Sequence, residues 1–196
     1  MTLRLASLAL FAALSAGPAF AQSQSEVIVT GAVQPQDEVI VTGGTVIAAE
    51  SPDALRLREA IAYANPMPNG APEGDYPLVA WCEALVRGHV ALGETLTDPD
   101  DLDRDILRLG RIEADNFRAA LNRSEARQTP AVKEAARAAA AQGASRWTAL
   151  MTAEDLARDQ AFGLFFGLPG RCEHAARRLF DNITTPPATP AEVGLE

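Results

Sequence analysis

Apolar residues recur every three or four positions through most of the chain from residue 51 onward, which is the spacing of one face of an α-helix. The stretch from about Pro77 to Thr97 shows this pattern most clearly. Its apolar stripe consists of Leu78, Cys82, Leu85, His89, Leu92 and Leu96. Such a stripe predicts an amphipathic helix that buries one face.

Proline directly after a capping residue marks three further helix starts, because a proline in the first turn forfeits no intrahelical hydrogen bond. The pairs are Ser51-Pro52, Asp98-Pro99 and Thr129-Pro130. We expect the first of these helices to end near Ala64 and the second near Gln128. The third should include Leu150.

The apolar stripes predict which faces of these helices are buried. In the helix that follows Pro99, the stripe consists of Leu102, Ile106, Leu109, Ile112, Phe117 and Leu121. In the helix that follows Thr129, it begins with small residues, and its members are Val132, Ala136, Ala139, Gly143, Trp147 and Leu150. The small residues predict a close approach of a neighbouring helix at that point.

Two more helices complete the pattern. Thr152 with Asp155 resembles a capping box and predicts a helix through Phe166. A last helix is expected from about Arg171 to Asn182. The predicted fold class is therefore all-α, a helical bundle of five to six helices packed around the second and third of them.

The two ends of the chain differ from this helical part in composition. Residues 22–50 are rich in Ser, Gln, Thr, Gly and β-branched residues, so we expect a flexible, β-capable N-terminal arm. Residues 51–183 are expected to form the helical domain. Residues 184–196 hold three prolines and are expected to be a disordered tail.

The first 21 residues have the three parts of a cleavable signal peptide in the required order. Arg4 supplies the positive charge, an apolar run follows over residues 5–14, and Ala19-Phe20-Ala21 offers a cleavage site. The run is too short to cross a bilayer, and we expect no membrane span in the later sequence. The protein is therefore expected to be exported to a bacterial periplasm or secreted.

The formal net charge is -9 at pH 7, and it becomes -10 when the signal peptide is removed with its one charge, Arg4. An acidic surface repels phosphate backbones and anionic headgroups. We therefore expect neither nucleic acid nor a membrane surface as a partner.

Cys82 and Cys172 are the two cysteines of the sequence, and both fall on apolar stripes. In an oxidising compartment an even count favours a disulfide, here between the second and last helices. The alternatives are a cysteine nucleophile paired with a histidine, or a zinc site formed with His89 and His174. Because Cys-x6-His and Cys-x-His are not the usual zinc spacings, we expect no metal ligands.

The sequence contains no P-loop, nucleophile elbow or metalloprotease helix. The aspartates from Asp98 to Asp105 lack the glycine and closing glutamate of an EF-hand, so they indicate helix capping and a solvated face. Four further carboxylates do not single out an acid–base pair, namely Glu83, Glu94, Glu113 and Asp115. We therefore assign no catalytic residues and no cofactor.

The alternative is a ligand- or metal-binding bundle, or a small enzyme, with a site near Trp81, His89 and Trp147.

A six-residue segment, Glu-Val-Ile-Val-Thr-Gly, occurs twice in the N-terminal arm, at residues 26–31 and 38–43. Each copy is a short β-capable segment closed by glycine. The copies resemble the TonB box, the extended segment near the mature N-terminus of TonB-dependent outer-membrane transporters. In that family the segment pairs as an added strand with the periplasmic domain of the TonB energy transducer.

The resemblance implies a set of partner-binding residues, which are Val27, Ile28, Val29, Thr30, Val39, Ile40, Val41 and Thr42. It does not extend to the transporter itself, because the sequence after residue 50 is helical in pattern. Our leading hypothesis is a non-enzymatic periplasmic interaction protein that binds another periplasmic protein by β-augmentation. The alternatives are a β-hairpin or linker strand packed on the helical domain, and a purely structural envelope protein.

Overall fold

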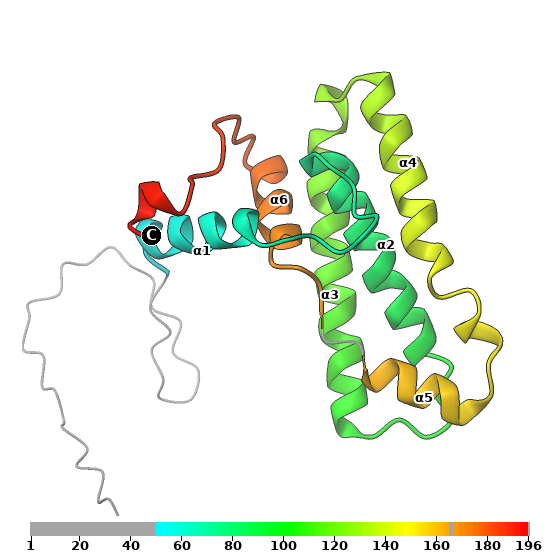
Figure 1. Cartoon of the computed structure of the whole chain (residues 1–196). Helices are drawn as coiled ribbons and strands as arrows, with labels where there is room; N and C mark the ends of the chain where they lie inside the picture. Colours follow the sequence, from blue (N-terminus) through cyan, green and yellow to red (C-terminus); the bar gives the residue numbers. More distant parts are fainter. Residues whose placement is uncertain (1–49, 165–166, 196) are drawn as a thin grey trace, which may run out of the picture. The chain divides into compact units, whose positions relative to one another are not determined.

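The computed structural model describes residues 50–164 and 167–195. The contacts within the chain divide it into two units, Met1–Ile47 and Ala48–Glu196. The first unit, with the expected signal peptide and the repeat of the arm, lies outside the described residues. The second unit is helical, and its α-helices, here labelled α1 to α6, are shown in Figure 1. The predicted all-α bundle is therefore confirmed for the described part of the chain.

Local capping sets the start of α1, Pro52–Ala64, and of α4, Pro130–Ser145. The Ser51 side chain accepts a hydrogen bond from the backbone N–H of Ala54 at 3.1 Å, and Thr129 caps α4 in the same way. Both helices have proline in their first turn, as the sequence predicts.

Helix α3, Asp101–Ser124, begins with a reciprocal capping box. The Asp100 carboxylate accepts from the backbone N–H of Asp103, and the Asp103 carboxylate accepts from the backbone N–H of Asp100. The helix therefore starts at Asp101, two residues later than Pro99, and a 3-10 turn, Glu125–Arg127, follows its end.

Helix α2, Asp75–Gly93, is the centre of the fold. It packs most extensively on α4 and α3, and it also contacts α6, Arg171–Phe180, and α5, Asp155–Gly163. Figure 1 shows α2 between α3 and α4, with α5 at one end of this layer and α1 beside α6. Several α2 side chains are at most 1% exposed: Leu78, Val79, Trp81, Cys82 and Leu92.

Glycines let helices approach α2 closely. A Cβ on Gly143 of α4 would lie 2.9 Å from the Trp81 carbonyl oxygen, so this position brings the α4 backbone directly against α2. A Cβ on Gly88 would lie 2.0 Å from Cδ1 of Trp147, so the glycine makes room for the indole. The close approach predicted from the small residues of the fourth helix is therefore present. Among the described residues, no helix combines the length and hydropathy needed to cross a bilayer.

The predicted buried stripe of α3 is wrong at three positions, since Leu102, Leu109 and Ile112 are 66%, 55% and 50% exposed. The physical reason is the contact with α2, which turns the small residues of α3 inward. A Cβ on Gly110 would lie 2.9 Å from Cγ2 of Val90. The buried side chains of α3 are instead Leu107, Ala114, Phe117, Ala120, Leu121 and Ser124.

The ends of the later helices also differ from the predictions. Helix α4 ends at Ser145, because the N–H groups of Arg146 and Trp147 turn back to carbonyls three residues earlier and close the helix. The predicted capping box at Thr152 is wrong, since Thr152 ends a short 3-10 turn and Glu154 precedes α5 without a side-chain cap.

The described part of the tail after α6 contacts the helices at two points. Arg178 donates a hydrogen bond to the carbonyl of Thr185, which ties the start of the tail to α6. A 3-10 turn, Ala191–Val193, contacts α1, and the Glu192 carboxylate accepts from the backbone N–H of Thr189. Composition alone could not show the first contact, because it depends on Arg178 of α6.

Candidate functional site

The predicted disulfide is present and joins α2 to α6. Cys82 and Cys172 are bonded, with their Cα atoms 6.1 Å apart, and both residues are at most 1% exposed. The bond consumes both thiols, so neither the cysteine nucleophile nor the cysteine–histidine zinc site is formed. Because the loop that it closes spans 90 residues, the bond ties together two distant parts of the sequence.

His89 is a buried residue of α2 within an aromatic cluster. Its Nε2 lies 2.9 Å from the carbonyl oxygen of Phe162, so a neutral ring can donate a hydrogen bond there. The ring stacks on Phe162 at 4.4 Å between centroids and lies 5.6 Å from the ring of Trp147. Burial lowers the pKa of His89, and the hydrogen bond to Phe162 opposes this shift.

His174 lies in α6 and is 3% exposed. Burial lowers its pKa, while the carboxylates of Glu173 and Glu59 act in the opposite direction. Within residues 50–164 and 167–195, no group of three or more His, Cys, Asp or Glu residues could hold a metal ion. The structure therefore does not bring the two histidines into one ligand set.

The four carboxylates considered from the sequence are not brought together as an acid–base pair. Glu83, which is 5% exposed, pairs with Arg87 and, at 2.6 Å, with Arg118. Glu94 lies 2.9 Å from Arg111, and Asp115 lies 3.5 Å from Arg87. Burial and the nearby charge of Glu173 raise the pKa of Glu113.

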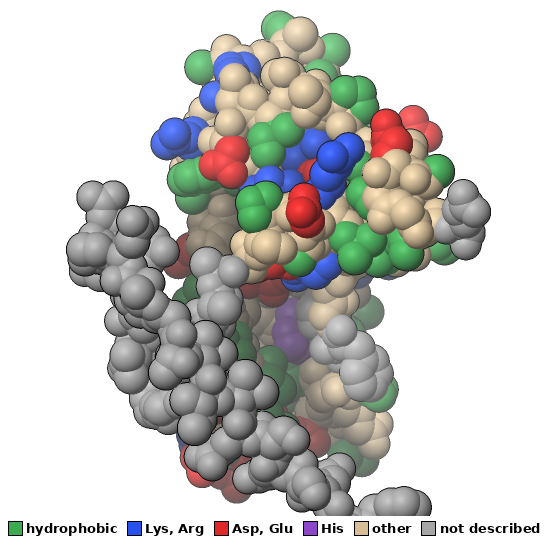
Figure 2. All heavy atoms as spheres, turned by 90° about the vertical axis from the view of Figure 1, so that its left-hand side faces the viewer, with side chains coloured by type: hydrophobic (Ala, Val, Ile, Leu, Met, Phe, Trp, Pro, Cys, Tyr) green, Lys and Arg blue, Asp and Glu red, His purple; other side chains and the backbone are tan. Residues whose placement is uncertain are grey.

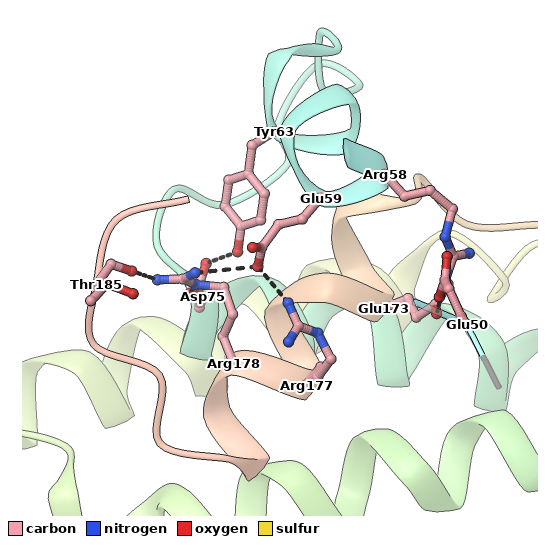
Figure 3. Close-up of polar contacts among 9 residues, drawn as sticks. All are labelled: Glu50, Arg58, Glu59, Tyr63, Asp75, Glu173, Arg177, Arg178 and Thr185. Atoms are coloured by element: carbon pink, nitrogen blue, oxygen red, sulfur yellow. Dashed lines mark hydrogen bonds and ion pairs between the residues drawn. The ribbon is translucent and has the colours of Figure 1, made fainter. Parts of the chain in front are cut away.

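A buried charge cluster connects α1, α2, α6 and the tail (Figure 3). Its centre is Glu59 of α1, whose carboxylate accepts hydrogen bonds from Arg177 at 2.9 Å and from Arg178 at 3.2 Å. Arg178 also lies 3.3 Å from Asp75, at the start of α2, and donates to the carbonyl of Thr185. We call these five residues the Glu59 cluster.

Tyr63 extends the Glu59 cluster along α1. Its hydroxyl donates a hydrogen bond of 2.7 Å to Asp75. Burial and this hydrogen bond raise the pKa of Tyr63, and the guanidinium of Arg171 lies 4.5 Å from its ring centroid. Figure 2, which faces α1, shows basic and acidic side chains intermixed on this surface. The Glu59 cluster therefore joins α1 to α2 and α6 through paired charges and helps to fix the position of α1.

A pocket with mostly apolar side chains lies between α2, the end of α4 and α5. It has a volume of about 370 Å³ and is lined by Pro68, Trp81, Leu85, Arg146, Trp147, Leu150, Ala161, Leu164, Gly167, Leu168 and Pro169. We call it the tryptophan pocket. Its inner residues are well buried, Trp81 being 1% and Trp147 8% exposed. This is the region that the sequence suggests for a site inside the bundle, although His89 is not among the lining residues.

Sequence reasoning missed Arg146 and the Glu59 cluster. Arg146 follows the last turn of α4, and its guanidinium carbon lies 5.5 Å from the ring centroid of Trp81. A basic residue at a helix end has an ordinary capping role, so nothing in the sequence marks this one. The pairing of Glu59 with Arg178 joins residues 119 positions apart and left no local signal either.

The predicted partner-binding residues of the two repeats, from Val27 to Thr42, lie outside the described residues. Comparison of the chain with protein-family models, with curated proteins and with solved structures finds no match.

Proposed function

We propose that this protein is an exported, non-enzymatic interaction module that binds a periplasmic protein through its N-terminal repeat. The observation that carries the proposal is the duplication of Glu-Val-Ile-Val-Thr-Gly at residues 26–31 and 38–43. The helical unit, tied by its disulfide, serves as the body from which the repeat is displayed.

Strand addition explains the residue types in the repeat. In an extended segment, Val27 and Val29 face one side while Ile28 and Thr30 face the other, so each copy can fill pockets on one side of a partner sheet. Backbone N–H and C=O groups pair with the edge strand and supply affinity. Because the second copy begins twelve residues after the first, binding of one copy raises the local concentration of the other.

The location of the proposed interaction rests on two observations. The first is the order of charge, apolar run and cleavage site in residues 1–21. The second is the bond between Cys82 and Cys172, since disulfides persist in oxidising compartments such as the periplasm. Both fit a partner in the periplasm, and the resemblance to the TonB box names the first one to test.

Isothermal titration of the chain from Gln22 to Glu196 with a TonB periplasmic domain tests the proposal. We expect saturable binding that weakens at least about tenfold when the four valines of the repeats, Val27, Val29, Val39 and Val41, are changed to Asp. The matched control changes the same valines to Thr, which is β-branched and keeps strand propensity, and it should retain binding. Absence of binding, or equal binding by the Asp variant, would contradict the proposal.

A further inference from the structure

We propose that the tryptophan pocket is a binding site for a small amphipathic carboxylate, such as a medium-chain fatty acid or an arylalkanoic acid. This inference does not rest on the proposed function of the repeat. It follows from the residues that line the pocket and from one cation at its rim.

The side chains that line the tryptophan pocket are apolar except for that of Arg146. Trp81, Leu85 and Trp147 form its buried side, and they are at most 8% exposed. Leu168 and Pro169, from the segment before α6, are partly exposed and complete the wall. A surface of this kind favours an alkyl or aryl group over a sugar or nucleotide.

Arg146 supplies a charge at the rim. It is the one charged side chain among the described residues of the lining, and it has no ion-pair partner in the described part of the chain. One of its N–H groups donates a hydrogen bond of 3.3 Å to the carbonyl oxygen of Asn69. This bond ties the Arg146 side chain to the loop between α1 and α2. The fork of a guanidinium matches a carboxylate, so the remaining donors favour an anionic headgroup.

Trp81 contributes its indole ring to the wall, and the guanidinium carbon of Arg146 lies 5.5 Å from the centroid of this ring. The charge of Arg146 therefore lies next to the apolar lining. This combination favours a ligand with acceptor oxygens at one end and an apolar body.

The volume limits the size of the ligand. At about 370 Å³ the tryptophan pocket is at the small end of the range for ligand sites. It suits a chain of about ten carbons or one substituted aromatic ring, but not a two-chain lipid. Decanoate is therefore a suitable probe, and decanol and decyltrimethylammonium have a similar apolar body with a neutral or cationic headgroup.

The site contains its own reporter, because Trp81 and Trp147 are the two tryptophans of the chain. We expect submicellar decanoate to change the tryptophan emission saturably. Decanol should bind at least about fivefold more weakly, and decyltrimethylammonium more weakly still. Arg146→Met should weaken decanoate binding at least about fivefold and leave decanol unchanged, whereas Arg146→Lys keeps the charge and should lose less.

The matched control is Arg108→Met, which removes an exposed arginine of α3. Arg108 is not one of the residues that line the pocket. It should leave decanoate binding unchanged. A second variant, Ala161→Phe, fills the pocket and should abolish the response, with the far-ultraviolet circular dichroism showing that the helices remain. No saturable response to decanoate, equal affinity for decyltrimethylammonium, or an unaltered response in Arg146→Met would each overturn the proposal.

Discussion

The guanidinium of Arg178 lies 3.2 Å from the carboxylate of Glu59, and their side chains are only 6% and 9% exposed. This ion pair joins α6 to α1, which otherwise buries few residues of its own. Charges taken out of water require partners, and the surrounding Arg177, Asp75 and Thr185 provide them. The position of α1 is therefore set by electrostatics as much as by apolar packing.

Replacement of Glu59 by Gln should destabilise the protein by about 3 kcal/mol, because it leaves a buried guanidinium without its main counter-charge. Urea denaturation measures the loss. The control is Glu134→Gln, whose ion pair with Arg137 is about 70% exposed on both sides and should contribute less than about 1 kcal/mol. Equal, small losses in both variants would show that the Glu59 cluster is not a determinant of stability.

Removal of the disulfide should lower stability by up to about 4–5 kcal/mol, since the bond closes a loop of 90 residues in the unfolded chain. The double variant Cys82→Ala with Cys172→Ala, compared with the oxidised protein by thermal unfolding, tests this. Intact mass should rise by about two daltons on reduction, and thiol labelling of the native protein should be negligible. Strong labelling before reduction would contradict the assignment.

Substitution of Gly88 by Ala should cost about 2–3 kcal/mol, because the added methyl group would overlap the indole of Trp147. Chemical denaturation gives the free energy of unfolding, and tryptophan emission should shift as the indole is displaced. Gly163→Ala serves as the control. A Cβ there meets nothing within 4 Å, so this change should be neutral or stabilising by up to about 1 kcal/mol. If Gly88→Ala were also neutral, the close packing of Trp147 on α2 would be wrong.

Stability should fall as the pH decreases from about 7.5 to 5.5. Burial lowers the folded-state pKa of both His89 and His174, so the unfolded chain, with histidine pKa values of about 6.5, binds protons first. Above about pH 7.5 both histidines are neutral in the folded and the unfolded chain, so the loss of stability begins as the pH falls below this value. Urea denaturation at several pH values in this interval gives the free energy of unfolding. Its slope against pH should be smaller in the variant His89→Gln with His174→Gln. An identical slope would exclude the histidines as its source.

The sequence could predict features that depend on neighbouring residues. The caps at Ser51 and Thr129 are local, and the burial of Cys82 follows from a repeated apolar spacing. The buried face of α3 could not be chosen in this way. The face that contains Leu102, Leu109 and Ile112 and the face that contains Leu107, Ala114 and Leu121 both have a helical spacing, and the contact of Gly110 with Val90 of α2 decides between them.

The candidate site was only partly predictable for the same reason. The sequence predicts, as an alternative, a site inside the bundle near Trp81, His89 and Trp147, and of these Trp81 and Trp147 line the tryptophan pocket. Arg146 shares the pocket lining with Leu168 and Pro169 of the segment before α6, and it donates a hydrogen bond to the carbonyl of Asn69. These contacts join segments that are distant in the sequence, so no local sequence pattern marks Arg146 as part of the site.

The most direct test of the proposed function is an amide nuclear magnetic resonance titration of isotope-labelled protein, residues 22–196, with a TonB periplasmic domain. We predict that shift changes concentrate at residues 26–31 and 38–43, and that the new positions are those of extended, hydrogen-bonded strands. Amides of the helical unit, such as those of Gly88 and Gly143, should remain in place. Unchanged spectra, or changes confined to the helical unit, would contradict the account.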